Sequence, residues 1–286
     1  MTAVTLAPIT LEDVGRVSEF FRAHLNERVP ASAWRALLDP PWPSESAPNR
    51  GFQLLEGDTV VGAYAAVYST RRIATEDVRV CNMAAFCVRE EHRAHSLRLL
   101  RAILAQKGYI FTDLSPSGNV PAMNERLGFR RVEAATRAVV NLPRPRGRGV
   151  SVTADPAGIS STLQGVDLEV YRDHHDAPAA RHLVVRSGGR HAYLMYRRDR
   201  RKGIPVFATP LYVGGDPAVL ADAWPSVAAH LLRQGLAVTL AESRILGFVP
   251  RGPGRVLANP RPRMFRGDVD PRRVDYLYSE LTLVEW

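Results

Sequence analysis

The chain has 286 residues, of which 45% are hydrophobic and 23% charged, a composition typical of a folded globular protein with a sizeable core and not of a disordered chain. Its longest apolar run, Val60 to Tyr68, is far shorter than the ~20 residues that a membrane-spanning helix needs, so no membrane association is expected. The net charge of +9 favours anionic ligands such as phosphates, but no nucleic-acid-binding motif accompanies it, and dedicated nucleic-acid binding is not expected.

The N-terminal residues and the cysteines bear on the cellular compartment. The N-terminus has no basic region followed by an apolar stretch, so no signal peptide is expected. Cys81 and Cys87, the only cysteines, lie in one apolar segment. If this segment is a strand, they share a face ~20 Å apart and cannot form a disulfide. We therefore expect a reducing, cytoplasmic environment.

The first half of the sequence predicts alternating helices and strands. A helix is expected over 10–25, where Thr10 and Asp13 form a capping-box-like start and apolar residues recur at helical spacing. A hairpin over 52–69 and a central strand over 78–88, apolar on both faces, follow. The remaining expected elements are a helix (96–108), a strand (109–114), a short helix (119–129) and a strand (129–142).

Residues 143–158 are rich in proline, glycine and arginine and show no apolar period, which predicts a linker. After the linker we expect a hairpin (181–196), a strand (203–213), a helix (216–235), a strand (236–242) and two final strands (262–267 and 275–286). This order repeats that of the first half, and Leu246-Gly247-Phe248 repeats Leu127-Gly128-Phe129. The sequence therefore predicts an internal duplication.

The segment between the strand over 78–88 and the helix over 96–108 has features of a phosphate-binding loop. Successive backbone N–H groups at a helix N-terminus bind pyrophosphate, and here they would come from Arg93 through Arg98. Ser96 could cap the helix or donate to a phosphate, and Arg98 could either clamp a phosphate or fill the site. The alternative interpretation is a capped, basic amphipathic helix without a ligand.

Two short motifs resemble those of the GNAT superfamily of acyl-CoA-dependent acyltransferases. Val88, Glu91 and Arg93, followed by "RAHSLR" without the usual glycines, are similar to the family's Val-x-Pro-Glu-Tyr-Arg-Gly-x-Gly-x-Gly/Ala. The Leu-Gly-Phe triplet is a second mark of the family, which includes tandem proteins such as N-myristoyltransferases and Fem-type aminoacyl transferases. The resemblance covers roughly residues 3–142 and extends over 180–286 as a degenerate copy.

This resemblance implies an α/β (α+β) fold of two GNAT-like domains, each a mixed, mainly antiparallel twisted sheet flanked by helices. Residues 1–142 would form the acyl-CoA-binding domain, 143–158 the linker, and 159–286 a degenerate domain that closes the acceptor pocket. The co-substrate would be acetyl-CoA or another acyl-CoA, with no metal.

The resemblance also implies which residues meet the cofactor. The pantetheine arm would pair with the strand end from Ala85 to Val88, where Cys87 could approach a thioester, although a buried structural cysteine is the commoner case. The expected cofactor-binding residues are Phe86, Cys87, Val88, Arg93, Ala94, His95, Ser96, Leu97 and Arg98.

The acid–base groups are less certain from the sequence. Asn124 stands where many family members place a tyrosine acid, and asparagine can donate a hydrogen bond but cannot supply a proton. Asp113, or its counterpart Glu242 in the second half, could accept the amine proton. Each could instead be a strand-end carboxylate paired with an arginine.

Three features of the second half carry weaker signals. The loop at Gly214-Gly215 lacks an arginine and is followed by Pro217, so no cofactor is expected there. The run "DHHD" at 173–176 indicates a polar helix end rather than a metal site, and "RRDRRK" at 197–202 indicates a solvated hairpin loop or a contact for a negatively charged substrate.

These observations predict an N-acyltransferase that moves an acyl group, with acetyl as first choice, from acyl-CoA to an amine of a small molecule or sugar. An acidic acceptor would match the basic charge. One alternative is a catalytically inactive GNAT-like binding or scaffold protein, which the missing glycines and tyrosine favour. The other is a Fem-like transferase that uses aminoacyl-tRNA.

Overall fold

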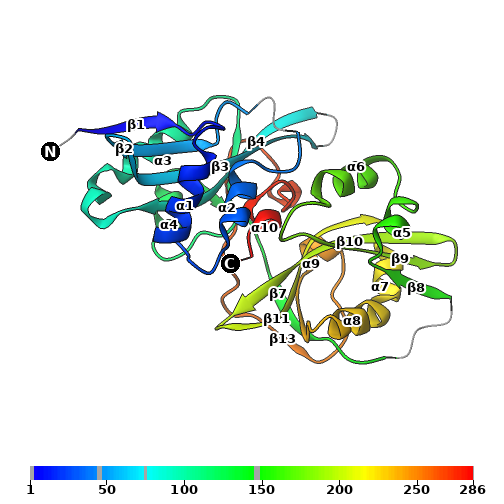
Figure 1. Ribbon diagram of the computed structural model, residues 1–286. Coiled ribbons are helices and arrows are strands. Elements are labelled where there is room, and N and C mark those ends of the chain that lie inside the picture. The colour runs from blue at the N-terminus through cyan, green and yellow to red at the C-terminus, as the bar shows by residue number, and fades with distance from the viewer. Residues whose placement is uncertain (1–2, 44–46, 74–75, 145–148, 286) are drawn as a thin grey trace. The chain divides into compact units, whose positions relative to one another are not determined.

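The computed structural model describes residues 3–43, 47–73, 76–144 and 149–285 (Figure 1). The chain forms two compact units. Unit 1 comprises Met1–Val132, Pro262–Val274 and Tyr278–Val284, and unit 2 comprises Glu133–Arg261, Asp275–Leu277 and Glu285–Trp286. Each unit contains one mixed, mainly antiparallel sheet with helices packed on it, which confirms the expected fold class.

The sheet of unit 1 has seven strands among the described residues, in the order β1-β2-β3-β4-β5-β14-β6. All neighbours are antiparallel except β4 and β5. The strands are β1 (Val4–Pro8), β2 (Gly51–Glu56), β3 (Thr59–Ile73), β4 (Glu76–Val88), β5 (Ile110–Asp113), β6 (Arg130–Arg131) and β14 (Met264–Arg266).

The helices of unit 1 cover this sheet. They are α1 (Val14–His24), α2 (Ala31–Leu38), α3 (Ser96–Leu104), α4 (Val120–Arg126) and α10 (Glu280–Leu283), with 3-10 turns η1 (Glu90–His95) and η2 (Pro271–Arg273). The helix α3 buries Leu99, Leu100 and Ile103 in a core that includes Val61 and Tyr68 of β3. This core fixes the segment that follows β4 against the sheet.

The sheet of unit 2 also has seven strands in the described part of the chain, in the order β13-β7-β12-β11-β10-β9-β8, and β11–β12 is its parallel pair. The strands are β7 (Thr136–Val140), β8 (Val150–Thr153), β9 (Arg181–Ser187), β10 (Arg190–Arg201), β11 (Ile204–Gly215), β12 (Val238–Glu242) and β13 (Gly254–Val256). The helices are α5 (Pro156–Ser160), α6 (Gly165–His174), α7 (Pro217–Asp222), α8 (Trp224–Arg233) and α9 (Ser243–Leu246).

The two units exchange one strand each. The strand β7 follows β6 in the sequence but pairs with β12 and β13 in unit 2. Conversely, β14 follows β13 but pairs with β5 and β6 in unit 1. The ranges 1–142 and 159–286 expected from the sequence therefore differ from the compact units, which each contain a strand from the opposite half of the chain.

Several expected elements need correction. The segment 129–142 is not one strand but two, β6 and β7, in different sheets. The expected linker, residues 143–158, contains β8 and the start of α5 outside the undescribed residues 145–148. The expected helix over 216–235 is divided into α7 and α8, because Pro225 occupies the first turn of the second helix and cannot donate a hydrogen bond to the first.

The C-terminal segment also differs from expectation. Residues 275–286 were expected to form a strand, whereas the structure has the short helix α10. The Ser279 side chain accepts a hydrogen bond from the N–H of Leu281 and so caps this helix.

The repeated Leu-Gly-Phe triplet has the same physical role in both units. Gly128 has a φ of +84° and Gly247 a φ of +76°, the left-handed conformation that favours glycine at a helix C-terminus. In unit 1 the N–H of Phe129 donates to the carbonyl of Asn124 across this turn. The triplet therefore ends α4 and α9 and is a local trace of the predicted duplication.

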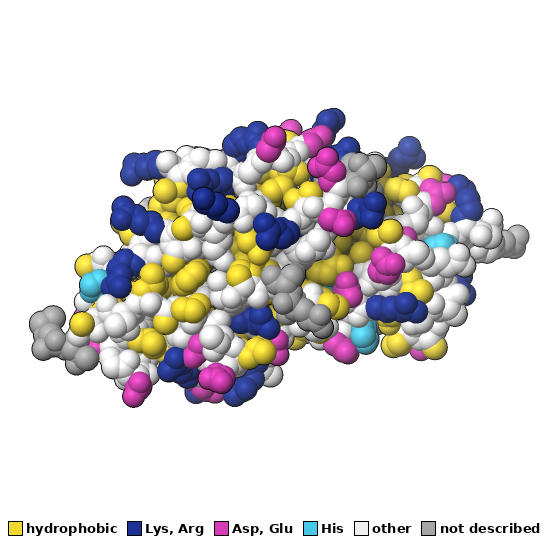
Figure 2. Space-filling model, turned by 90° about the horizontal axis from the view of Figure 1, so that it is seen from above, with side chains coloured by type: hydrophobic (Ala, Val, Ile, Leu, Met, Phe, Trp, Pro, Cys, Tyr) yellow, Lys and Arg dark blue, Asp and Glu magenta, His cyan; other side chains and the backbone are white. Residues whose placement is uncertain are grey.

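The surface is basic without a single continuous basic patch on the face shown. In Figure 2 the lysine and arginine side chains are scattered among acidic and apolar ones. Within the ranges that the structure describes, no helix has the length and apolar character needed to cross a membrane.

The strand exchange predicts where a core substitution acts. Met264→Ala on β14 removes a fully buried side chain from the core of unit 1 and should destabilise that unit by about 2–5 kcal/mol. Hydrogen exchange should show lost protection in β5 and β6. Val256→Ala on β13 is the control, since Val256 is 69% exposed, and should change stability by less than about 0.5 kcal/mol. Lost protection confined to β11 and β12 in the Met264 variant would contradict the exchange.

Candidate active site

The parallel strands of unit 1 part after a short contact. The strands β4 and β5 pair only from Val80 to Asn82 of β4. Beyond this point β4 continues along β3 as far as Val88, whereas β5 ends at Asp113. A bulge marks the divergence, because Tyr64 pairs with Phe86 while Ala66 pairs with Met83, which leaves one extra residue in β4. The edge of β4 beyond Asn82 therefore has no β5 partner.

The expected cofactor residues Phe86, Cys87 and Val88 lie on this part of β4. The Phe86 ring packs against Tyr64 at a centroid distance of 4.9 Å. The Cys87 thiol lies 3.4 Å from the carbonyl oxygen of His24 and donates to it, and burial raises its pKa although the nearby Arg93 opposes the shift. A thiol that keeps its proton is a weak nucleophile, which favours a structural role for Cys87.

The segment after β4 is wound into a 3-10 turn, η1, that continues directly into α3. The N–H of His92 donates to the carbonyl of Arg89, and the N–H of Ser96 donates to that of Arg93. Of the backbone donors expected at Arg93 through Arg98, that of Ser96 is thus engaged within the chain's own helical turn. Ala94 and Leu97 are exposed there, and His95 and Ser96 are partly buried.

The charges at the start of η1 are mixed. Glu90 and Glu91 occupy its first turn. A hydrogen bond from its own N–H is the main cause that holds the pKa of the Glu91 carboxyl below its usual range, and the Arg89 guanidinium lies 2.5 Å from it. The side chain of Arg93 is 69% exposed and lies 3.5 Å from Glu90. An incoming phosphate would meet Arg93 together with these two carboxylates.

Arg98 has a definite partner in this structure. Its Nη1 donates to the carbonyl oxygen of Val4 on the edge strand β1 at 2.9 Å. The guanidinium therefore braces α3 against β1.

The two residues of unit 1 expected to take part in catalysis lie together at the strand divergence. The Nδ2 of Asn124 on α4 donates to Oδ2 of Asp113 at 2.8 Å. Asp113 is only 5% exposed. Burial, and next the charge of Glu280, raise its pKa from the usual 3.8 to about 7, although Asn124, the Ser115 N–H and Arg263 oppose the shift. Among the described residues, no partner reaches the buried Oδ1 of Asn124.

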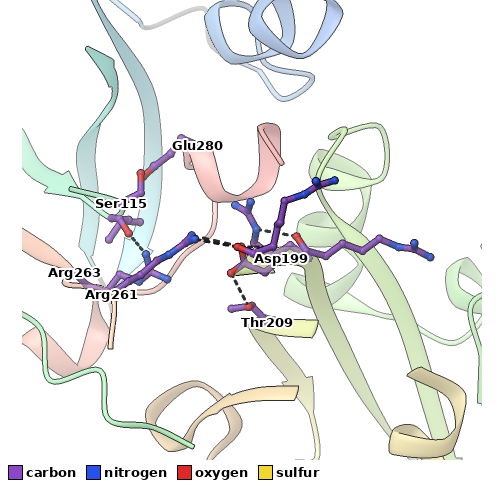
Figure 3. A network of polar contacts seen from close by, with 10 residues as sticks. Ser115, Asp199, Thr209, Arg261, Arg263 and Glu280 are labelled. Carbon is purple, nitrogen blue, oxygen red and sulfur yellow. Dashed lines mark hydrogen bonds and ion pairs between the residues drawn. The ribbon is translucent and has the colours of Figure 1, made fainter. Parts of the chain in front are cut away.

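Further polar residues near Asp113 were not predicted, and Figure 3 shows three of them, Ser115, Arg263 and Glu280. The Oγ of Ser115 donates to Oε1 of Glu280 at 2.7 Å, and the Glu280 N–H donates to Oδ1 of Asn82 at 3.0 Å. Nη1 of Arg263 donates to the carbonyl of Leu114. In the sequence, Glu280 is marked only by its position after Ser279 at the start of α10. This pattern indicates the start of a helix and not a catalytic site.

Glu242, the third expected catalytic residue, lies in unit 2 at the end of β12. Both of its oxygens are engaged, since Tyr276 Oη donates to Oε2 at 2.5 Å and Arg244 Nε donates to Oε1 at 2.9 Å. The carboxylate is therefore held as a buried ion pair.

The loop of unit 2 that corresponds to η1 holds an internal carboxylate. The Gly215 N–H donates to Oδ2 of Asp167 at 2.8 Å, and Tyr212 Oη donates to Oδ1 at 2.7 Å. A Cβ at Gly214 would clash with the same carboxylate. Asp167, from the first turn of α6, thus takes the position near the loop where a phosphate would need space.

The two remaining motifs lie in ordinary secondary structure of unit 2. His174 is buried at the end of α6, with its Nδ1 against the carbonyl of Val170, and in the described residues no group of His, Cys, Asp and Glu is arranged to hold a metal ion. Residues 197–202 form the end of β10 and its turn, where Asp199 is buried and accepts from Thr209 at 3.1 Å and from Arg261 at 3.4 Å (Figure 3).

Comparisons with known proteins identify the fold. No family model matches the sequence, and no curated protein matches it. Among solved structures, a GCN5-related N-acetyltransferase from Anabaena variabilis has a TM-score of 0.59 at 10% identity, over 92% of this chain and 72% of that one. A GCN5-related N-acetyltransferase from Kribbella flavida has a TM-score of 0.54 at 15% identity, over 92% and 71%.

A yeast acyltransferase structure is also similar. N-myristoyltransferase of Saccharomyces cerevisiae with bound myristoyl-CoA has a TM-score of 0.51 at 9% identity, over 98% of this chain and 85% of that one. These structural similarities extend over both units. At such low sequence identity they show the fold alone. The chain therefore has the fold of the GCN5-related N-acetyltransferases, with a sheet of this kind in each of its two units.

Proposed function

We propose that the chain is an acyl-CoA-dependent N-acyltransferase that moves an acyl group, with acetyl the simplest case, to an amine of a small molecule or sugar. The observation that carries this proposal is Asp113, a buried carboxyl with a pKa of about 7 at the point where β4 and β5 part. A general base works best when its pKa lies near the working pH. Asp113 meets this condition, whereas both oxygens of Glu242 are engaged by Tyr276 and Arg244.

The open edge of β4 supports acyl-CoA as the donor. Backbone N–H and C=O groups of the stretch 84–88 that face away from β3 have no β5 partner. An extended chain of amides such as pantetheine can pair with such an edge as an added strand would. The exposed guanidinium of Arg93 is available to a phosphate at the end of the same strand.

The chemistry assigned to this chain's residues is proton transfer and orientation. An amine attacks a thioester only after it has lost its proton, and Asp113 would accept that proton directly or through water. The hydrogen bond from Asn124 holds the Asp113 carboxyl in place. Asn124 can donate a hydrogen bond to a leaving thiolate, but it supplies no proton.

A second candidate, a non-catalytic binding module, is favoured by the structure of η1. The N–H groups of His92 and Ser96 donate to carbonyls of the same turn, and Glu90 and Glu91 place negative charge at its start. A thermal-shift assay with CoA, acetyl-CoA and longer acyl-CoAs separates the candidates. A ligand at 100 times its dissociation constant stabilises a fold by ~2.7 kcal/mol, and no shift with any of these ligands would favour the binding module.

Coenzyme A binding should depend on Arg93. Arg93→Ala removes the exposed cation at the start of α3 and should weaken CoA binding about tenfold to a hundredfold, the equivalent of a charge-assisted hydrogen bond of ~1.5–3 kcal/mol. Isothermal titration calorimetry measures this affinity. Arg101→Ala, an exposed arginine in the last turn of α3, is the matched control and should leave it unchanged. Equal affinity for both variants and the parent chain would place the phosphates elsewhere.

Acyl transfer should depend on Asp113. With acetyl-CoA and a panel of small amines and amino sugars, Asp113→Asn should lower kcat about 10²- to 10⁴-fold, because the base is lost. For the unaltered chain, kcat should rise with pH through about 7 as Asp113 releases its proton. Asp77→Asn, an exposed aspartate on β4, is the control. An unchanged pH profile in the Asp113 variant would assign the base to another group.

The same carboxyl should affect stability without any substrate. Between pH ~4 and ~7 folded Asp113 keeps a proton that the unfolded chain has released, because its pKa rises from 3.8 to about 7. Its contribution to stability therefore falls as pH rises through this window. The melting temperature of Asp113→Asn, relative to the unaltered chain, should increase from pH 4 to pH 8. A difference that stays constant with pH would show that Asp113 titrates normally.

A further inference from the structure

The C-terminal segment contributes a buried carboxyl to unit 1. Residues Tyr278–Val284 belong to this unit, and Glu280 at the start of α10 is 0% exposed. Its N–H donates to Oδ1 of Asn82, which lies on β4 at the last position paired with β5. The segment is therefore fixed at the divergence of the two strands, beside Asp113.

Ser115 bridges the two carboxyl groups, and Figure 3 shows Ser115 and Glu280 of this arrangement. Its N–H bonds to the carboxyl of Asp113, while its Oγ donates to Oε1 of Glu280 at 2.7 Å. The other oxygen, Oε2 of Glu280, is buried, and among the described residues no hydrogen-bond partner reaches it. A buried carboxylate oxygen without a donor is costly, whereas a protonated one is a neutral hydroxyl.

The groups that face this pair carry too little positive charge for two carboxylates. Arg263, which precedes β14, is the cation that acts on both. Asn82 of β4 and Asn124 of α4 are neutral. The hydroxyl of Tyr64 on β3 and the thiol of Cys81 on β4 are buried and hold their protons, since burial raises the pKa of both. Two buried carboxyl groups that bond to the same residue, Ser115, in such surroundings do not both ionise.

We propose that Asp113 and Glu280 share a single proton, and that Glu280 is a positioning residue through which the C-terminal segment sets the charge of Asp113. The pair holds one negative charge, which Arg263 balances. The effect of Glu280 on catalysis rests on the proposed function, in which Asp113 is the base. The shared proton does not, because it depends only on the folded chain. Such a pair titrates as a unit.

The test is a titration of the side-chain carboxyl carbons by ¹³C NMR on the full-length protein without ligand. Glu280→Gln removes the second charge and keeps the shape, so the apparent pKa of Asp113 should fall by about one unit or more. Glu280→Asp should keep it near the parent value. Glu285→Gln is the matched control, since Glu285 is an exposed residue of the same C-terminal segment that pairs with Arg181 in unit 2.

The reciprocal variant keeps the test possible if Glu280→Gln does not fold. Asp113→Asn should lower the apparent pKa of Glu280, since each carboxyl raises the other. An unchanged pKa of the remaining carboxyl in either folded variant would overturn the inference. If the pKa values shift but acetyl-CoA is never consumed, the shared proton is supported and the proposed function is contradicted. If acyl transfer is found while the pKa values do not shift, the proposed function is supported and the shared proton is contradicted.

Discussion

The short parallel contact between β4 and β5 is the constraint on which unit 1 depends. Strands that pair at three positions and then part cannot satisfy each other's backbone groups beyond that point. Where the strands part, the side chain of Asn82 on β4 accepts the N–H of Glu280. From there to Val88 the edge of β4 has no β5 partner. The same divergence buries Asp113 away from water, and this burial is the main cause of its raised pKa.

The two units treat the equivalent positions differently. In unit 2 the strand-end carboxylate Glu242 has donors on both oxygens, and the N–H of the loop residue Gly215 donates to the carboxylate of Asp167. In unit 1 the described residues leave Oδ1 of Asn124 and Oε2 of Glu280 buried without a partner. Buried polar groups are nearly always satisfied, so such exceptions concentrate where a protein does something other than hold itself together. The strand-end carboxylate of unit 2 thus has donors on both oxygens, whereas the polar cluster around Asp113 in unit 1 has two buried oxygens without a partner among the described residues.

The sequence predicts most elements, because strong local signals mark them. The left-handed glycines of both Leu-Gly-Phe turns, and the Asp216-Pro217 start of α7, are examples. The Leu-Gly-Phe motif located Asn124, but its hydrogen bond to Asp113 was not predicted. The strand exchange could not be predicted, because β14 has only three residues and either half could supply it without any change of pattern. Glu280 could not be found either, since it contacts Ser115 from 165 residues away.

The exchange of β7 and β14 also has a consequence for biosynthesis. When β5 and β6 have left the ribosome, the strand that lies between them has not yet been made, since it comes from residues 264–266. At about 5–20 residues per second, the N-terminal sheet waits on the order of ten seconds for its missing strand. Throughout that interval two unpaired edges are exposed, which are templates for pairing with other chains. The sheet of unit 1 can therefore be completed only near the end of translation, after all strands of the unit 2 sheet, which lie within residues 136–256, have been made.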